Sequence, residues 1–395
     1  MSVISVGLVL LLASFGLGTL LTNRARVIAP KFGLVDKPGG RKAHQAPTPM
    51  GGGVAIWLTT VLVIGLGAGG VLALRGQLPA EVAIHINGML SRAPEFVLIL
   101  ALGSLIMIMG LIDDRVGLHW APRLLIQFGL ATILVSQGVR ITLFWPFHSP
   151  ILCGALTVFW IVGLTNSFNF LDNMDGLAAS VGLIAAVLFA MAQAMVQSLF
   201  VPAVLIVLVG ALGGFLVYNR YPASIFMGDA GSNFLGFMLG SLTVAGTFTR
   251  PEQGYSPYSV LSPLLVMAVP LYDTCSVILI RIREGRSPFQ ADRRHFSHRL
   301  VERGLSAPQA VMTIALVTLA GGLGALLLPN LGAFGAFVVV LQTICLLGLV
   351  AILEYASPPP AARPASHSSG SSPSEHDHVE AKIESSAADE SRASA

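Results

Sequence analysis

Long apolar runs make up most of this chain, and short polar segments separate them. About eleven of these runs have close to the 17–25 residues that a bilayer-spanning helix needs. They cover residues 3–22, 52–73, 96–112, 122–138, 150–165, 177–197, 199–217, 232–248, 259–280, 307–328 and 331–353. The pattern predicts an all-α polytopic membrane protein whose transmembrane domain occupies residues 1–354.

The last part of the chain differs in composition. Residues 355–395 begin with a run of prolines and continue mainly with serine, alanine, glutamate and aspartate. Such a segment cannot bury enough apolar surface to offset the entropy of ordering it. It is predicted to be a disordered cytoplasmic tail.

The overall composition agrees with a membrane protein. Charged residues are 11% of the chain and hydrophobic residues 54%, whereas soluble proteins carry about a quarter charged residues. The net charge of +3 does not predict a nucleic-acid partner, because the basic residues lie in short loops between apolar runs. Cys153, Cys275 and Cys345 lie within apolar runs, which favours reduced core residues over a disulfide framework or a metal site.

The distribution of lysine and arginine predicts the orientation. Arg24 and Arg26 follow the first apolar run, so this run does not resemble a secretory signal and the N-terminus is expected outside. The loops then expected on the cytoplasmic side are 23–51, 113–121, 166–176, 218–231 and 281–306. They hold 15 Lys and Arg, or 16 with Arg123, against 4 in the opposite loops. This bias also places the C-terminus in the cytoplasm.

Four polar segments on that same face carry the candidate chemistry. They are Asp113-Asp114, Asn166 to Asp175, Gly228 to Ser232, and His295 to His298. Carboxylates, amides and imidazoles are costly near lipid, so their clustering indicates a functional site.

The two acidic motifs each allow two interpretations. Asp113 and Asp114 end an apolar run, where they would bind Mg²⁺ or act as a base, or else form a solvated helix end paired with Arg115. Asp229 lies in a glycine-rich turn before a helix, which suits a metal ligand or a phosphate site on backbone amides. An ordinary helix cap is the alternative there.

The second segment is more informative. Asn166, Asn169, Asp172 and Asp175 recur every three residues, which places them along one stripe of a helix end or turn. Two amides and two carboxylates on one stripe suit a polar ligand, and Gly176 permits close backbone approach. Capping of the next helix by Asp175 would explain that residue alone.

Basic residues in two loops are candidates for binding phosphate. The last loop holds Arg294, His295 and His298, which suit a phosphate or simply an anionic lipid surface. His44 lies in the first loop, a proline-rich basic segment. Asp273, within the apolar run before the last loop, is either catalytic or paired with a neighbouring helix.

Together these motifs resemble the polyprenyl-phosphate N-acetylhexosamine-1-phosphate transferases of glycosyltransferase family 4. This family includes WecA-type and TagO-type enzymes and the related MraY, and the resemblance covers about residues 30–305. It implies a Mg²⁺- or Mn²⁺-dependent enzyme in the bacterial inner membrane with its active site in the cytoplasm. The implied reaction transfers a sugar-1-phosphate, most closely GlcNAc-1-phosphate, from a UDP-N-acetylhexosamine to undecaprenyl phosphate. UMP is released, as the first step of a cell-envelope glycan pathway.

The resemblance also assigns roles to residues. Asp113 and Asp114 match tandem acids with a catalytic role, and Asp229, Asp114 and Asp175 are the expected metal ligands. The expected substrate-binding residues are Asn166, Asn169, Asp172, Arg123, His295, His298, Arg294 and His44. The other expected partner is membrane lipid. A homodimer is left open as a further partner.

Three positions depart from the family's pattern. Asn173 replaces the first glycine of Asp-Gly-x-Asp-Gly, and Ser297 replaces the middle histidine of His-x-His-His. Arg123 stands where many members have lysine, which keeps the charge but changes the shape. The arginine-rich last loop looks closer to the WecA and TagO branch than to MraY.

Other functions remain open on the sequence alone. One is an MraY-like phospho-MurNAc-pentapeptide transferase, and another is a non-enzymatic lipid or solute transporter that uses intramembrane acids for coupling. An inactive scaffold is a third, favoured only by the departures at Asn173 and Ser297. A transporter predicts charges near the middle of the helices, whereas the acids here lie mainly at helix ends.

Overall fold

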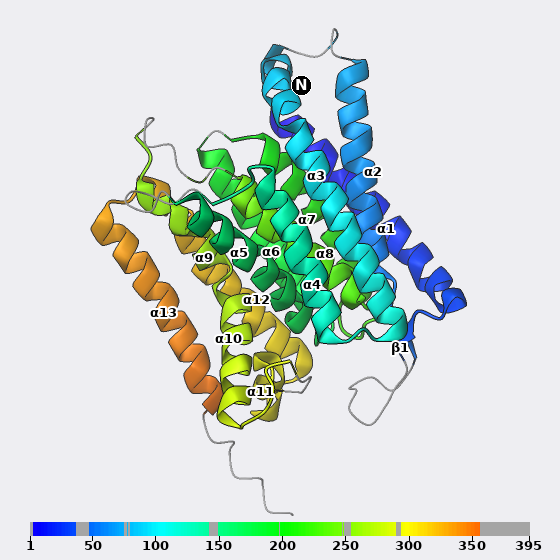
Figure 1. The fold of residues 1–395 in the computed structure, drawn as a ribbon, viewed down its shortest axis with the longest axis vertical. Helices are drawn as coiled ribbons and strands as arrows, with labels where there is room; N and C mark the ends of the chain where they lie inside the picture. The colour runs from blue at the N-terminus through cyan, green and yellow to red at the C-terminus, as the bar shows by residue number, and fades with distance from the viewer. Residues whose placement is uncertain are drawn as a thin grey trace, which may run out of the picture. The chain divides into compact units, whose positions relative to one another are not determined.

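The computed structural model describes residues 3–36, 47–74, 77, 80–141, 149–196, 198–246, 248, 254–289 and 294–355. They belong to one compact unit, Met1–Ala356, and the predicted tail lies outside the described residues. Figure 1 shows this unit as a bundle of long helices, with α13 and α1 at opposite outer edges.

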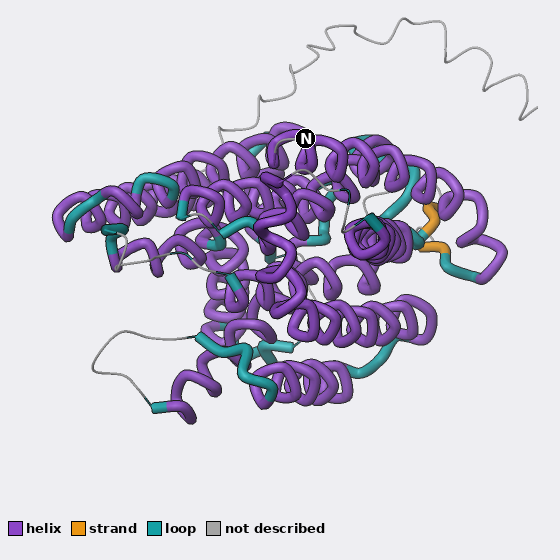
Figure 2. Tube along the Cα trace, turned by 90° about the horizontal axis from the view of Figure 1, so that it is seen from above, coloured by secondary structure: helices purple, strands orange, loops and turns teal. Residues whose placement is uncertain are grey.

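The long α-helices follow the predicted apolar runs. The α-helices are α1 (Val3–Ile28), α2 (Gly52–Ala73), α3 (Ala80–Val116), α4 (Trp120–Ser136), α5 (Pro150–Leu171), α6 (Leu177–Met195), α7 (Phe200–Asn219), α8 (Gly228–Ala245), α9 (Ser262–Val266), α10 (Ala268–Arg283), α11 (Phe296–Glu302), α12 (Ala307–Ala325) and α13 (Ala333–Tyr355). Short 3₁₀ helices are η1 (Ala29–Phe32), η3 (Pro257–Leu261) and η4 (Leu328–Asn330). The all-helical class is confirmed, and Figure 2 shows how little of the described chain is anything else.

Fewer helices qualify as membrane spans than the sequence predicts. In the described part of the chain, 8 helices are long and apolar enough to cross a membrane, and 9 if η3–α9 and α10 form one bent span. The predicted runs at 122–138 and 232–248 account for the difference. α4 has only 17 residues, and the first turn of α8 carries the acid Asp229. The run at 259–280 is broken by a 58° bend before Ala268.

α8 lies at the centre of the bundle, with α2, α3 and α5 against it. Nearly every residue from Ala230 to Ala245 is buried. Small residues make this close packing possible: a Cβ on Gly53 would lie 2.1 Å from the Gly231 nitrogen, and one on Gly236 2.6 Å from the Leu164 oxygen. α8 is therefore surrounded by protein instead of lipid.

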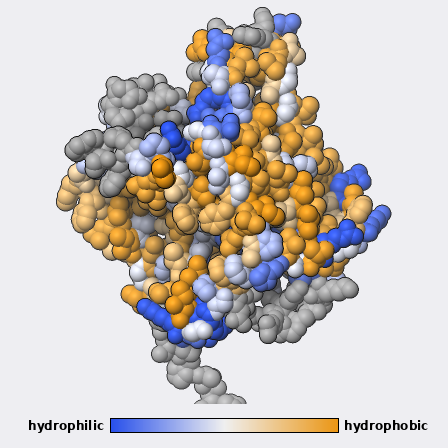
Figure 3. Space-filling view, in the orientation of Figure 1, coloured by the Kyte–Doolittle hydropathy of each residue, from blue (hydrophilic) through white to orange (hydrophobic). Residues whose placement is uncertain are grey.

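The outer helices present apolar side chains to their surroundings. Only 11% of the most apolar window of α1 and 22% of that of α13 is buried. Figure 3 shows a broad apolar surface on this face, with hydrophilic residues gathered mainly toward its margins. This is the surface that a bilayer requires, since lipid tails are as apolar as leucine side chains.

One small sheet departs from the all-α prediction. β1 (Val35–Asp36) pairs antiparallel with β2 (Thr48–Pro49), and Met50 bridges to Phe226. The amides of Gly52 and Gly53 then donate to the carbonyls of Phe226 and Met227 at 3.0 and 2.9 Å. The start of α2 is thereby fastened to the segment that leads into α8.

Candidate functional site

The ends of α3 and α5, the start of α4 and the start of α8 meet at one end of the bundle. This meeting point brings together the first three polar segments, which are far apart in the sequence. The fourth segment, at the start of α11, lies against the turn that follows α5. The predicted association of the four segments is therefore seen in the structure.

Asp113 lies in the last turn of α3 and is buried. Its Oδ2 accepts a hydrogen bond from Arg123 of α4 at 2.5 Å, and its Oδ1 accepts the Leu118 amide at 2.7 Å. The interpretation of a solvated helix end paired with Arg115 is wrong, because the ion pair is made with Arg123. The tight turn after α3 folds α4 back so that Arg123 reaches Asp113.

Asp114, the neighbouring residue, faces the N-terminus of α8. Its two carboxylate oxygens accept the amides of Asp229 at 2.7 Å and Ala230 at 3.1 Å. A Cβ on Gly228 would lie 2.6 Å from the Asp114 carboxylate, and the φ of Gly228 is +71°. The glycine is needed for both reasons. The amides that the sequence suggested for phosphate binding are thus already used by Asp114.

Asp229 is held by residues from two other helices. Asn169 of α5 donates to its Oδ1 at 2.6 Å, and Arg123 lies 3.5 Å from its Oδ2. Asn169 also donates to Ser232 at 3.1 Å. One carboxylate therefore joins α4, α5 and α8.

Beyond this carboxylate, side-chain amides form a hydrogen-bonded row. Asn166 donates to Gln127 at 2.6 Å, and Gln127 donates to Asn233 at 3.1 Å. Asn233 donates in turn to the Asp229 carbonyl at 2.7 Å. Because each amide is oriented by the next, the row fixes the positions of α4, α5 and α8 relative to one another.

Asp172 is the C-cap residue of α5 and lies beside the other acids. Burial raises the pKa of Asp172 to about 8, and the negative charges of Asp229 and Asp114 add to the effect. A backbone hydrogen bond from Gly228 opposes it. The carboxylates are therefore close enough that the negative charge of each opposes ionisation of the others. A bound cation would offset this repulsion.

Asp175 does not cap the next helix. The N-cap of α6 is Gly176, whose φ is +75°, and Asp175 Oδ2 accepts the Ala223 amide at 2.9 Å. Asn219 Oδ1 accepts the Gly176 amide at 3.0 Å. Glycine is required at position 176 because of this backbone conformation. Lack of space is not the reason, because an added Cβ would make only ordinary contacts. The two bonds tie this turn to the end of α7 and to the loop between α7 and α8.

The histidine segment rests on a buried acid. Asp273 of α10 lies 2.9 Å from His295 Nδ1 and accepts the Phe296 amide at 2.7 Å. Of the two interpretations for Asp273, pairing with a neighbouring segment is what the structure shows. Asp273 orients His295 and caps α11 at the same time.

The rest of the basic segment is spread around α11. His298 is half-buried in α11, and the exposed Arg294 pairs with Glu284 at 3.2 Å. His44 lies outside the described residues. The structure therefore brings His295 and His298 to the site's edge, whereas Arg294 has an acidic partner elsewhere.

A buried ion pair supports α11 from behind. Arg299 pairs with Glu354 of α13 at 3.0 Å, and Tyr272 donates to the same Glu354 oxygen at 3.2 Å. Arg303 Nε donates to the Glu354 carbonyl at 2.8 Å. The short helix is thus held between α10 and the end of α13.

Several residues that position the site were not identified from the sequence. Asn233 and Asn219 contact site residues, and Gly110 lies where a Cβ would come 2.3 Å from the Asp229 carbonyl. Only Asn233 stood beside a recognised motif. The others lie in apolar or loop surroundings that give no signal until the fold brings them to the site.

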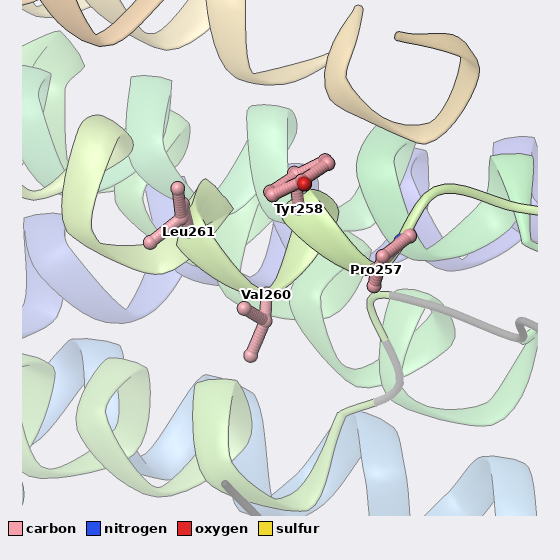
Figure 4. Close-up of a pocket in the computed structure, with 4 residues that line it drawn as sticks. All are labelled: Pro257, Tyr258, Val260 and Leu261. Carbon is pink, nitrogen blue, oxygen red and sulfur yellow. The ribbon is translucent and has the colours of Figure 1, made fainter. Parts of the chain in front are cut away.

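A hollow of about 340 Å³ lies around η3 (Figure 4). It is lined by Pro257, Tyr258, Val260 and Leu261. η3 follows the far end of α8 from Asp229, and none of these four residues is an acid, a histidine or a basic residue. Its described lining holds none of the site's carboxylates, and the hollow is separate from the carboxylate cluster.

The carboxylate cluster suits a hard divalent cation in its chemistry. Among the described residues, no three His, Cys, Asp or Glu side chains are arranged as a ready-made metal cage. Mg²⁺ does not need one, because it keeps several waters and binds through one or two carboxylates together with substrate phosphates. Asp229 and Asp172, which lie side by side with half-buried carboxylates, have the oxygen donors for this.

Fold and site together define a class: a multi-pass membrane protein with a carboxylate site at one end of its helical bundle. The sequence model of glycosyl transferase family 4 matches residues 96–247, which include the first three polar segments. Two relatives extend the match over most of the chain. A decaprenyl-phosphate N-acetylglucosaminephosphotransferase of Mycolicibacterium smegmatis is 36% identical over 324 residues, 75% of each chain.

The second relative is an undecaprenyl-phosphate alpha-N-acetylglucosaminyl 1-phosphate transferase of Escherichia coli K12. It is 30% identical over 331 residues, which cover 78% of this chain and 79% of the relative. The chain belongs to glycosyl transferase family 4, within the group that transfers a sugar-1-phosphate to a polyprenyl phosphate. The predicted family is confirmed, and the protein is a membrane enzyme.

Proposed function

We propose that this enzyme transfers GlcNAc-1-phosphate from UDP-GlcNAc to undecaprenyl phosphate and releases UMP. The observation that carries the proposal is the position of Asp229, which contacts Arg123 and Asn169 and whose helix is capped by Asp114. A site that joins three acids and one arginine at a helix end suits a diphosphate with a cation. The relatives named above act on the same sugar.

The reaction sets the electrostatic requirements. An oxygen of the lipid phosphate attacks the phosphorus that bears the sugar, and the bond from that phosphorus to UMP breaks. Both reactants are anions, so positive charge must offset their repulsion and stabilise the leaving UMP. A bound Mg²⁺ supplies that charge and orients the phosphates. Arg123, already between Asp113 and Asp229, supplies part of it from the protein side.

We assign Asp229 and Asp172 as the nearest candidate cation ligands, with Asp114 behind Asp229 as its support. Asp113 holds Arg123 in place. As a base it would have to take a proton from an incoming phosphate. That proton is largely absent at neutral pH, since the second pKa of a phosphate monoester is about 6. The role of Asp113 in this proposal is therefore mainly to position Arg123.

His295 and His298 are proposed to contact the phosphates from the α11 side. His295 is oriented by Asp273, and His298 lies one turn further along the helix. Imidazolium groups and arginines are effective partners for phosphate oxygens. We also propose that this end of the bundle faces the cytoplasm, because loops at that end hold the excess of lysine and arginine.

Purified protein with UDP-GlcNAc, undecaprenyl phosphate and Mg²⁺ should release UMP, with the lipid product identified by mass spectrometry. UDP-GalNAc and UDP-MurNAc-pentapeptide in parallel reactions test the sugar, and excess chelator tests the cation. Asp229→Asn should lower the rate by at least about 100-fold, whereas Glu302→Gln, at the exposed end of α11, should leave it unchanged. Absence of turnover with every donor would falsify the proposal, and movement of an unaltered substrate into sealed vesicles would favour a transporter.

A further inference from the structure

Asn173 and Ser297 are hydrogen-bonded to each other although 124 residues separate them in the sequence. The Ser297 hydroxyl donates to Asn173 Oδ1 at 2.5 Å. The other end of the same amide, Nδ2, donates to the Phe170 carbonyl at 2.6 Å. The Asn173 side chain is thus fixed at both ends, between the last turn of α5 and the start of α11.

The bond joins two parts of the candidate site. Asn173 lies between Asp172 and Asp175, in the turn that carries these carboxylates. Ser297 lies between His295 and His298 and is buried, with 2% of its surface exposed. Phe170 and His295 also meet across the gap in an edge-to-face contact, with ring centroids 5.5 Å apart. The hydrogen bond between Asn173 and Ser297 is directional and fixes the relative positions.

These are also two of the three positions at which the chain departs from the pattern it resembles. A glycine at 173 has no side chain to accept a hydrogen bond, so the observed bond requires asparagine or a similar residue there. Asparagine at 173 is larger than the glycine of the pattern, and serine at 297 is smaller than its histidine. The two changes therefore compensate each other in volume and in hydrogen bonding.

We propose that Asn173 and Ser297 form a matched pair of positioning residues. The pair sets the spacing between the carboxylates of the α5–α6 turn and the histidines of α11, and through it the affinity for the diphosphate of the sugar nucleotide. This inference rests on the proposed function for its substrate. The pairing itself rests on geometry alone.

Each single exchange should leave a defect that the double exchange repairs. Asn173→Gly removes the acceptor and leaves the buried Ser297 hydroxyl without this partner, which is unfavourable in a buried site. Ser297→His forces an imidazole against an amide already in close contact. The double variant Asn173→Gly with Ser297→His gives the larger ring the space that the asparagine occupied.

The test is a double-mutant cycle on the full-length protein in detergent, read by kcat and KM for UDP-GlcNAc and by the thermal midpoint. Each single variant should raise KM about tenfold, and the double variant at most about threefold. Ser297→Thr, which keeps the hydroxyl, should stay within about twofold of wild type. Thr243→Val, which removes the similar bond from Trp160 at 2.9 Å, should lower the thermal midpoint and leave KM unchanged.

KM effects that multiply in the double variant would overturn the proposal, because independent residues behave in that way. Changes confined to the thermal midpoint would overturn it as well, since they show a role in stability only. Wild-type protein without turnover contradicts the proposed function instead. In that case the cycle in thermal midpoints still decides whether the two residues are coupled.

Discussion

The carboxylate of Asp114 caps the helix that begins with Gly228 and Asp229. Two amides at the start of α8 donate to Asp114, and a third, from Gly228, donates to Asp172. Helix N-termini favour negative charge, because their first amides lack partners within the helix and the helix dipole is positive there. Acids from α3 and α5 thus fix the position of the acid on α8.

This arrangement makes Gly110 a sensitive position. A Cβ there would lie 2.3 Å from the Asp229 carbonyl and 2.6 Å from the Ala230 Cα. Gly110→Ala should push the start of α8 away from Asp114 and lower UMP release by at least about tenfold, given the 1–3 kcal/mol that overpacking costs. Gly129→Ala, in open space on α4, is the matched control and should retain full activity. Equal activity of the two variants would show that the position of α8 does not depend on its close approach to Gly110.

Arg123 should matter through its shape as well as its charge. It contacts Asp113 and approaches Asp229, so Arg123→Ala leaves both carboxylates without a cation. We expect a loss of at least about 100-fold in kcat, and about tenfold for Arg123→Lys, which keeps the charge. The exposed Arg115 is the control, and Arg115→Ala should change kcat less than twofold. A large effect at Arg115 would restore the pairing that the sequence suggested for Asp113.

Asp273 is expected to act through His295. Asp273→Asn keeps the side-chain shape and an acceptor for the Phe296 amide but removes the charge that faces Nδ1. The hydrogen bonds of a charged group contribute about 1.5–3 kcal/mol, so activity should fall about 10- to 100-fold. The measurement is kcat for UMP release, with the thermal midpoint recorded in parallel. Full activity with a lowered thermal midpoint would assign Asp273 a role in folding alone.

The raised pKa of Asp172 predicts how cation affinity depends on pH. Its carboxyl is largely protonated below pH 8, and a cation must displace that proton. The apparent affinity for Mg²⁺, measured by calorimetry, should therefore rise from pH 6.5 to about 8 and level off above. Asp172→Asn should reduce this rise and leave the smaller part that comes from Asp229, whose pKa burial also raises. A rise of unchanged size in the variant would locate the proton elsewhere.

The same pKa has a consequence for stability without a cation. The folded state holds the Asp172 proton more tightly than the unfolded chain, whose aspartate pKa is 3.8. The free energy of unfolding should accordingly fall as pH rises from about 4 to about 8, the window between the two pKa values. Thermal midpoints of cation-free protein measured across this window would show the decline, and Asp172→Asn should make it shallower.

Much of the architecture could be predicted from the chain itself. Apolar length marked the positions of all the long helices, because a helix buried in lipid must be apolar on every side. The same argument overestimated the number of spans. Apolarity is also what a helix needs when it is enclosed by protein, as α8 is, and length alone does not show the bend before Ala268.

The candidate site divides in a similar way. The polar segments were visible because polar groups are rare in this composition, and their spacing singled out Asn166, Asn169, Asp172 and Asp175. Their partners were not visible. Asp113 bonds to Arg123 instead of Arg115, and Asp175 holds Ala223 instead of capping α6. Adjacent residues on a helix point in different directions, so nearness in sequence did not predict these bonds.

The sequence by itself determined the class of protein, its helical segments and the residue types available for chemistry, since these follow from hydrophobicity and composition. The tertiary structure alone decided which of those residues touch. The bond between Asn173 and Ser297 depends on how α5 and α11 pack, and the cap of Asp114 on α8 depends on the close approach that Gly110 and Gly228 allow. Contacts across more than a hundred residues arise from packing, and local sequence patterns carry no record of them.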